Sequence, residues 1–469
     1  MKTICKTPKF ILSCTCVIFA LSGCTVGPDY EKPKIDVSKN WSETNINKTK
    51  VEDVASKEKS VEWWKEFKDP LLNKLITKAK SQNLTLKEAK ARVREARALS
   101  HGADAELFPK IDVVGGVTKG DKATAAGGGT TKLFDAGFDA VWEADIFGGN
   151  RRSAEAADAN FEAVQADYDD VMLSLVAEVA RNYVEVRLYQ QQLALAKNTA
   201  EIQADTARIS EARYKQGVEG KLEIVRANAQ LSSTKAQIPL YENLIGASTY
   251  QLDFLLGEQP GALKKQLAEE KEIPLIAPEI ALNEPVKVIA NRPDLKVAEH
   301  NLAAATALQG VAIADLYPKL SLSAALGFES GSSNNLFRSS NRVWSIGGSV
   351  LAPLFDFGRI RANIDAADAR QEQAMAQYQA AVLFVLKDVE TSLLNYAKET
   401  ERHEALLDAA ANSKKAVEIS QLQYKEGVIS QLDVLQAQQT MYDADTALAQ
   451  STANVSYALI ALCKALAVQ

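Results

Sequence analysis

The sequence predicts a mainly α-helical fold that carries a small number of membrane-type β-strands and is built from two copies of one pattern. Three observations support this fold class. Sequence phrases recur at an offset of 209 or 210 residues. Two very long stretches have helix-forming composition and contain neither glycine nor proline. Shorter segments alternate apolar residues with small or acidic ones, which is the period of a β-strand.

The composition is that of a folded, helix-rich chain. Its 469 residues exceed the usual size of one domain, and 46% of them are hydrophobic and 24% charged. The formal net charge of −6 argues against a general nucleic-acid binder. We therefore expect several domains or one elongated architecture, with no nucleic-acid partner.

The first residues have the pattern of a secretory signal that ends at a cysteine. Three lysines precede "FILSCTCVIFAL", which is too short to span a bilayer as a stable helix. The phrase "LSGC", which ends at Cys24, matches the lipobox of bacterial lipoproteins. We expect residues 1–23 to be removed as a signal peptide, Cys24 to be acylated, and residues 24–60 to follow as an extended N-terminal segment. A plain cleaved signal with a coincidental cysteine is the alternative.

Removal of this signal would change both the charge and the thiol content. The net charge would move from −6 to −9 because three lysines are lost. Cys463 would remain as the free thiol, so no intramolecular disulfide framework is expected. Thr25 follows Cys24, where an aspartate would suggest retention in the inner membrane, so the resemblance to bacterial lipoproteins points to the outer membrane.

The chain repeats itself once. "LFPKIDVVGG" from Leu107 returns as "LYPKLSLSAA" at an offset of 209, and "FGGNRRSAEAADA" from Phe147 returns as "FGRIRANIDAADA" at an offset of 210. Matches in the same order at nearly one offset indicate a duplicated half. We expect a first repeat over 61–257 and a second over 285–469, separated by a proline-containing linker over 258–284.

Each repeat contains one very long helix that ends in a turn. Asn150–Gln216 and Arg359–Glu426 lack glycine and proline, and each would rise about 100 Å as a helix, a length typical of coiled-coil-like packing. The phrases "YKQGVEGKLEIVRA" and "YKEGVISQLDVLQA" follow, with Gly217 and Gly427 at the position where a helix commonly ends in a left-handed residue. A second helical pattern starts a few residues later in each repeat. The sequence therefore predicts two helical hairpins.

Four segments read as strands. "LFDAGFDAVWEAD" and "KLSLSAALGFE" alternate with period two, and 111–118 and 343–352 do so more weakly because glycine interrupts them. The segments "KGDKATAAGGGTTK" and "SGSSNNLFRSSN" are expected to be loops that join them in pairs. The alternation suits membrane strands or, equally, the edge of a soluble β-sandwich. Four strands cannot close a barrel, and open edges cannot face lipid, so membrane strands would require an oligomer.

Four acidic residues fall on the side of these strands opposite the large apolar residues. We expect them to form an acidic lumen, although some could belong to rims or loops. These candidate lumen acids are Asp135, Asp139, Glu143 and Glu329.

The mature sequence resembles the TolC-like outer-membrane efflux proteins, in their lipid-anchored NodT-type (OprM-like) branch. The resemblance covers essentially the whole mature chain, and its phrases are specific as a set although none carries catalytic chemistry. The phrases that carry it are "LSGCTVGPDY", "WWKEFKDPLL", "EADIFGGNRR", "LLGEQPG", "NRPDLKVAE" and "APLFDFGRIRA".

The resemblance implies a homotrimer in the bacterial outer membrane. Each protomer would give four strands to a twelve-stranded β-barrel, and the long helices would continue as an α-helical barrel across the periplasm. Such a trimer is a passive exit duct for small molecules, and it docks on a periplasmic adaptor (membrane fusion) protein and an inner-membrane efflux pump. The pump would supply the energy, so the duct itself needs no cofactor.

The resemblance also assigns roles at the hairpin tips. Asp433 matches an aspartate that the family places around the periplasmic aperture, and Glu223 is its counterpart in the first repeat. Tyr214 and Tyr424 match tip tyrosines that take part in closing bonds. Gln436 stands where relatives often carry another acid, which puts the charge of the gate in doubt. The alternative for each is a solvated or packed residue on an amphipathic helix.

No motif of catalysis or metal binding is present in the sequence. There is no nucleophile elbow, phosphate loop or zinc helix, and the three histidines have no paired ligand spacing. We therefore expect no enzyme. Two other readings stay open: a lipid-anchored periplasmic adaptor or coiled-coil scaffold, which would be expected to have one hairpin and a compact sheet domain, and a lipoprotein hydrolase. The transported cargo is not encoded in any motif.

Overall fold

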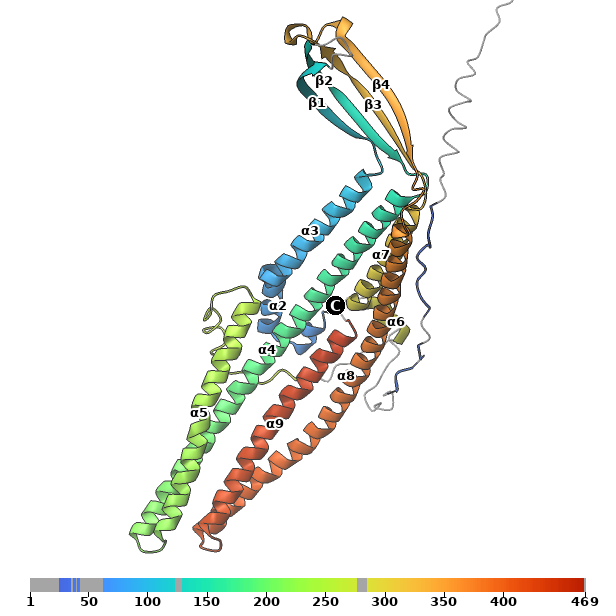
Figure 1. Cartoon of the computed structure of the whole chain (residues 1–469). Helices are drawn as coiled ribbons and strands as arrows, with labels where there is room; N and C mark the ends of the chain where they lie inside the picture. The colour runs from blue at the N-terminus through green and yellow to red at the C-terminus, as the bar shows by residue number, and fades with distance from the viewer. Residues whose placement is uncertain are drawn as a thin grey trace, which may run out of the picture. The chain divides into compact units, whose positions relative to one another are not determined.

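The computed structural model describes residues 25–34, 37–38, 40–42, 62–122, 129–275 and 285–467 (Figure 1). These residues form two compact units. The strand unit comprises Met1–Ile35, Ala91–Ala166 and Lys296–Ala380, and the hairpin unit comprises Asp36–Lys90, Asp167–Leu295 and Ala381–Gln469, each as far as it is described. The helices and strands, in chain order, are η2 (Trp63–Phe67), α2 (Pro70–Gln82), α3 (Leu84–Ala105), β1 (Lys110–Lys122), β2 (Gly129–Ala144), α4 (Gly149–Lys215), α5 (Lys221–Leu255), α6 (Pro285–Asn291), α7 (Pro293–Ala314), β3 (Lys319–Ser330), η4 (Ser333–Asn335), η5 (Ser339–Asn341), β4 (Arg342–Leu351), α8 (Arg359–Lys425) and α9 (Gln431–Ala465).

The strand unit is built around one antiparallel sheet in the order β1-β2-β3-β4. The central pair joins the two repeats, with Ala136 of β2 opposite Phe328 of β3. Because side chains alternate across a strand, the period-two pattern places most of the large apolar residues on one face and most of the small and acidic residues on the other, which we call the small-residue face. Val114, Val141 and Leu351 are among the exceptions that fall on the small-residue face. β1 and β4 are the two edges of this sheet within the described residues.

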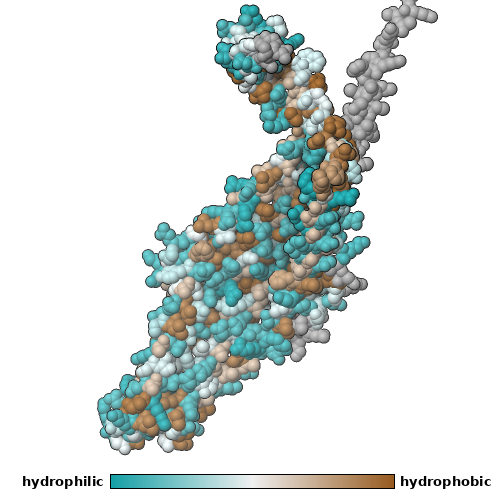
Figure 2. Space-filling view, viewed as in Figure 1, coloured by the Kyte–Doolittle hydropathy of each residue, from teal (hydrophilic) through white to brown (hydrophobic). Residues whose placement is uncertain are grey.

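The apolar face of the sheet is largely exposed in the protomer. Val113 and Ile346 are each 79% exposed, and Trp344 is 70% exposed. Apolar surface also gathers at the foot of the sheet, next to the helix ends of the same unit (Figure 2), where Leu354 and Phe355 are exposed. A sheet with exposed apolar side chains on one face and small and acidic residues on the other has the pattern of membrane strands that face lipid on one side.

Glycine is required at one point in the middle of the sheet. Gly137 of β2 lies directly opposite Gly327 of β3. A Cβ at Gly137 would lie 2.7 Å from the Cα of Gly327 and 2.7 Å from the carbonyl oxygen of Leu326, which is closer than side-chain atoms approach a backbone. The two strands can therefore come this close only without side chains at these positions.

The strands are longer than the sequence analysis predicted. Residues 119–122 and 129–132 were expected to lie in a loop, but they continue the β1–β2 ladder as far as Lys122 opposite Gly129. The Thr130 hydroxyl donates to Asp121 Oδ1 at 2.6 Å across this extension. Pairing of Thr130 and Thr131 with the opposite strand therefore keeps these residues in the sheet, although their composition is typical of a loop. The helices α4 and α8 each have 67 residues and end within one residue of the predicted limits.

The hairpin unit contains the main hydrophobic core. Tyr183 and Val179 of α4 pack there with Leu72 of α2 and Leu252 of α5, and all four are essentially fully buried. Leu263, in the segment that follows α5, joins the same core. The α4–α5 and α8–α9 hairpins are thus held to their neighbours by apolar contacts, as expected of amphipathic helices of this length.

The N-terminal segment of the strand unit is fixed at the start of α4. The backbone nitrogen of Val26 donates to the Phe147 carbonyl at 3.1 Å. Arg152 is buried and donates to the carbonyl of Val26 and to Asp29 Oδ1, at 3.1 and 2.6 Å. The first described residues therefore lie against the junction between β2 and α4. Cys24, the expected acylation site, lies outside the described residues.

Within the described part of the chain, no helix combines the length and the apolar character that a membrane-spanning helix needs.

Candidate functional site at the hairpin tips

Both hairpins turn with the same backbone geometry. Gly217 and Gly427 have φ of +73° and +76°, in the left-handed region that favours glycine. In the first tip the Gly217 nitrogen donates to the Tyr214 carbonyl at 2.9 Å, and in the second the Gly427 nitrogen donates to the Tyr424 carbonyl at 3.0 Å. The next residue in each tip, a valine, donates to the carbonyl five residues back, Val218 to Arg213 and Val428 to Gln423, at 2.9 Å in both tips. This is the Schellman arrangement, which satisfies the last carbonyls of a helix.

The two acidic residues predicted at the aperture occupy the third position of the second helix in each hairpin. Asp433 is exposed, and its Oδ2 accepts hydrogen bonds from the nitrogen and the hydroxyl of Ser430 at 2.9 and 2.6 Å. These bonds, the hydroxyl bond first, hold the pKa of Asp433 below its ordinary value. Glu223 is half-buried beside Gly220, in the first turn of α5. A negative charge in the first turn of a helix is favourable.

Tyr424 joins the two tips to each other. Its hydroxyl donates to Glu219 Oε1 of the first tip at 2.5 Å, and Arg213 Nε lies 2.7 Å from the same oxygen. The Arg213 guanidinium also lies over the Tyr424 ring, 4.9 Å from its centre. Burial, and after it the hydrogen bond to Glu219, raises the pKa of Tyr424 to about 12. We call Arg213, Glu219 and Tyr424 the tip cluster.

Tyr214, the equivalent tyrosine of the first repeat, is in a different environment. It is 44% exposed, whereas Tyr424 is 5% exposed. Both tyrosines were predicted from the sequence, whereas Arg213 and Glu219 were not. A signal for them existed, because the second repeat has the neutral Gln423 and Ile429 at the same positions.

Polar side chains continue the contact between the hairpins above the tip cluster. The Gln438 amide of α9 donates to the Thr206 hydroxyl of α4 at 3.0 Å, and the Gln431 amide donates to the Ser210 hydroxyl. Gln438 and Ser210 are fully buried. An interface closed by buried polar pairs is specific in register but gains less from burial than an apolar one. These contacts join α4 of the first hairpin to α9 of the second.

The four candidate lumen acids lie on one face of the sheet. Asp135 stands directly opposite Glu329, and Asp139 stands opposite Asp112 of β1. Glu143 faces Ser321. Asp112 was not predicted, although it falls on the same face. Like charges directly opposite one another destabilise a sheet, so this face concentrates negative charge at a cost in stability.

The described residues contain no group of three or more metal-ligating side chains.

A protomer with two long helical hairpins and a four-stranded sheet with an exposed apolar face is that of a channel protein of an outer membrane. The chain belongs to the outer membrane efflux protein family, whose model matches residues 75–258 and again residues 285–468. The two matches agree with the internal duplication. The resemblance and the fold class expected from the sequence are thereby confirmed.

Individual relatives resemble the chain over most of its length. The pyoverdine export outer membrane protein OpmQ of Pseudomonas aeruginosa is 32% identical over 415 residues, which cover 86% of each chain. Nodulation protein T of Rhizobium leguminosarum bv. trifolii is 29% identical over 433 residues, covering 92% of this chain and 91% of its own. The solved structure of the outer-membrane channel OprN has a TM-score of 0.90 and 32% identity, covering 95% of this chain and 99% of its own. The chain is an outer-membrane efflux channel protein, and its family forms trimeric exit ducts of tripartite efflux systems.

Proposed function

We propose that three copies of this chain close into one duct that conducts small molecules out of the periplasm. The observation that carries the proposal is the four-stranded sheet, which has an exposed apolar face and, among the residues that the structure describes, no strand paired to its edges β1 and β4. Edges of this kind cannot face lipid, and closure of the sheet into a ring removes them. Three sheets of four strands give a ring of twelve. The duct takes no part in catalysis under this proposal.

The hairpin tips form the gate of this duct. The tip cluster holds the tip of α4–α5 to the tip of α8–α9 through two contacts on one carboxylate, that of Glu219. Asp433 is exposed and is ionised at neutral pH, as an ordinary aspartate is, so three copies place three negative charges at the mouth. Opening separates the two hairpins at the tip cluster, and the polar pairs of α4 and α9 are the next to part.

The duct works with a periplasmic adaptor and an inner-membrane pump, and an acyl group on Cys24 adds a lipid anchor. Relatives are named for different cargoes: OpmQ for pyoverdine export and CusC of Escherichia coli for cation efflux. Cargo selection is therefore assigned to the pump, and the duct is a shared exit.

The test is a direct measurement of conduction. Full-length protein extracted from outer membranes is expected to migrate as a trimer on semi-native gels. The same protein, reconstituted in planar bilayers, is expected to give discrete conductance steps that prefer cations. A stable monomer, or the absence of any conductance from intact trimers, would overturn the proposal.

A further inference from the structure

The internal duplication extends to the hydrogen-bond register of the sheet. Lys110 of β1 lies opposite Val141 of β2. The equivalents of these two residues in the second repeat, at offsets of 209 and 210, are Lys319 and Leu351, and they also lie opposite each other. The β3–β4 pair therefore repeats the β1–β2 pair without a shift. One further pairing, β2 with β3, has no equivalent inside the protomer.

The missing equivalent is a contact between two copies of the chain. Under the same offsets, β2 corresponds to β4 and β3 corresponds to β1, and these are the two edges of the sheet. We infer that β4 of one protomer pairs with β1 of the next in the register of β2 with β3, so that Ser345 lies opposite the neighbour's Gly120. Their equivalents inside the protomer are Asp135 and Glu329. The inference rests on the proposed ring and adds its register.

This register keeps the two faces of the sheet continuous across the boundary. On the small-residue face, Gly347 lies opposite Thr118 and Ser349 opposite Gly116 of the neighbour. On the apolar face, Leu354 lies opposite the neighbour's Ile111 at the foot of the strands, as Ala144 lies opposite Leu320 inside the protomer. A shift of one residue would place apolar side chains of one copy on the small-residue face of the other.

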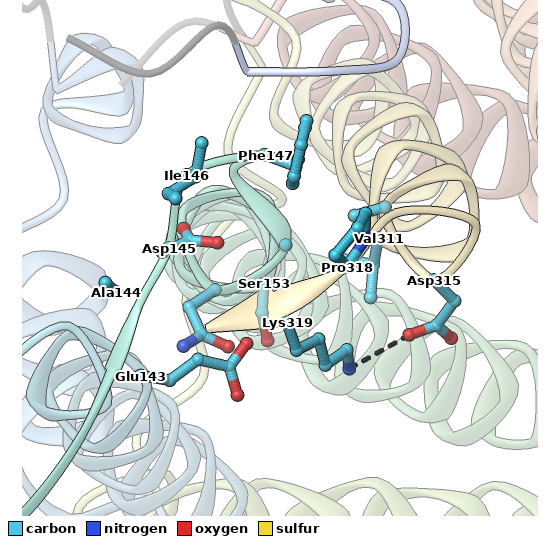
Figure 3. Close-up of a pocket in the computed structure, with 13 residues that line it drawn as sticks. Glu143, Ala144, Asp145, Ile146, Phe147, Ser153, Val311, Asp315, Pro318 and Lys319 are labelled. Atoms are coloured by element: carbon cyan, nitrogen blue, oxygen red, sulfur yellow. Dashed lines mark ion pairs between the residues drawn. The ribbon is translucent and has the colours of Figure 1, made fainter. Parts of the chain in front are cut away.

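The junction at the foot of the sheet supports the same arrangement. Inside the protomer the Phe147 ring stacks on Tyr317, with ring centres 4.6 Å apart and planes at 21°. Phe147 lines a small pocket where β2 and α4 meet α7 and β3, with Asp315 paired to Lys319 at 3.0 Å (Figure 3). The aromatic equivalents at the edges are Phe357 and Phe108, and they are 90% and 68% exposed.

The exposure of Phe357 is unusual in itself. Its φ is +56°, in the left-handed region that bulky residues rarely adopt, whereas the φ of Phe147 is negative. A strained backbone persists where its surroundings determine it, and the protomer leaves this ring almost uncovered. A neighbouring copy supplies the cover. The strand register follows from the offsets and does not depend on the detail of this ring contact.

Side-chain sizes at the helix ends are also complementary across the boundary. Inside the protomer the large Arg152 of α4 packs over Gly310 of α7, where a Cβ would lie 2.9 Å from the arginine Cδ. The equivalents are Ala362 of α8 and His101 of α3, both exposed. The large and small residues have changed places, so the total volume at the contact is roughly preserved.

Cysteine pairs test the register. The full-length variant with Ser345→Cys and Gly120→Cys is expected to form covalent dimers and trimers on mild oxidation, because directly opposite residues bring Cβ atoms within about 5 Å. Gly120 tolerates the change, since no atom lies within 4 Å of its added Cβ. Ser345→Cys with Thr118→Cys, two residues out of register, is the matched control and is expected to cross-link at least tenfold more slowly. Val141→Cys with Ser323→Cys, which are opposite inside the protomer, is expected to form an intramolecular disulfide.

The outcomes separate this inference from the proposed duct. Covalent trimers with the in-register pair support the inference. Two outcomes overturn the register and leave the duct intact, provided that trimers are seen on semi-native gels. In one, only the Ser345→Cys, Thr118→Cys variant cross-links. In the other, neither variant cross-links although the Val141→Cys, Ser323→Cys control oxidises. A chain that migrates as a monomer in every variant and in the unmodified protein overturns both.

Discussion

Two tyrosines at equivalent positions show how a duplicated site has diverged. Tyr424 is buried against Glu219 and Arg213, whereas Tyr214 is largely exposed. The difference follows from Arg213 and Glu219, since the second repeat has no charged residue at either of their positions. A hydrogen bond to a charged group stabilises more than a neutral one, so the contact at Tyr424 has a measurable weight.

Removal of the Tyr424 hydroxyl is expected to favour the open mouth. Tyr424→Phe keeps the ring under Arg213 but removes the bond to Glu219, a loss of about 1–2 kcal/mol in the closed state. Since 1.4 kcal/mol is about tenfold in an equilibrium, the open population should rise by roughly an order of magnitude. Single-channel recording measures this as longer open times. Tyr214→Phe is the matched control, and an equal effect from it would show that the tip cluster does not hold the gate.

High pH is expected to open the same contact. The folded-state pKa of Tyr424 is raised to about 12 from an ordinary value of 10, so its contribution is fully present below pH 10 and is lost as the pH rises through 12. Ionised Tyr424 would face the carboxylate of Glu219, with Arg213 as the nearby cation. Conductance recorded from pH 8 to pH 11.5 should rise toward the upper end in the unmodified protein. In Tyr424→Phe this rise should be absent, and its persistence there would assign it to another group.

At the scale of the strands, the acidic face of the sheet has a cost that can be measured. Asp135 lies opposite Glu329, and like charges in this position destabilise by about 0.2–1 kcal/mol. Asp135→Asn is therefore expected to raise the dissociation temperature of the trimer and to lower its preference for cations. Asp121→Asn, whose partner is a threonine hydroxyl, is the control. Unchanged ion selectivity in Asp135→Asn would argue against an acidic lumen.

The Gly137–Gly327 crossing makes a sharper prediction for the same element. Gly137→Ala would force a Cβ against the β3 backbone, so the central strands must move apart. We expect little folded trimer in outer membranes from this variant. Gly115→Ala is the control, because its added Cβ meets only the Asp135 carbonyl oxygen at 3.8 Å. Normal amounts of heat-modifiable trimer from Gly137→Ala would show that the strands can separate without loss of the sheet.

Helices and strands of this chain could be predicted from local sequence, while contacts between distant segments could not. The long helices could be predicted because their segments lack glycine and proline, and the two tips because each has a glycine. Helices and turns both depend on residues that are close in the sequence. The bond from Tyr424 to Glu219 joins residues 205 apart, and the pairing of Asp139 with Asp112 depends on strand register. The extended β1–β2 ladder escaped prediction for the same reason, because a partner strand stabilises residues with loop composition.

At the scale of the whole molecule, membrane attachment could come from the strands, from an acyl group on Cys24, or from both. One acyl chain anchors a protein only marginally, whereas a closed ring of strands with an apolar outer face is inserted stably. The exposed apolar side chains of β1 and β4 indicate that the strands dominate.

Cys24→Ser separates these two contributions. The variant, made with a signal peptide that is cleaved without lipidation, is expected to remain in the outer membrane as a trimer after alkaline carbonate extraction, because the twelve strands hold it there. Cys463 is a free and buried thiol, so it does not offer a second site for the anchor. Membrane fractions and semi-native gels measure both properties. If carbonate released the Cys24→Ser chain while leaving the unmodified protein in place, the acyl group would be the anchor and the sheet would lie outside the lipid.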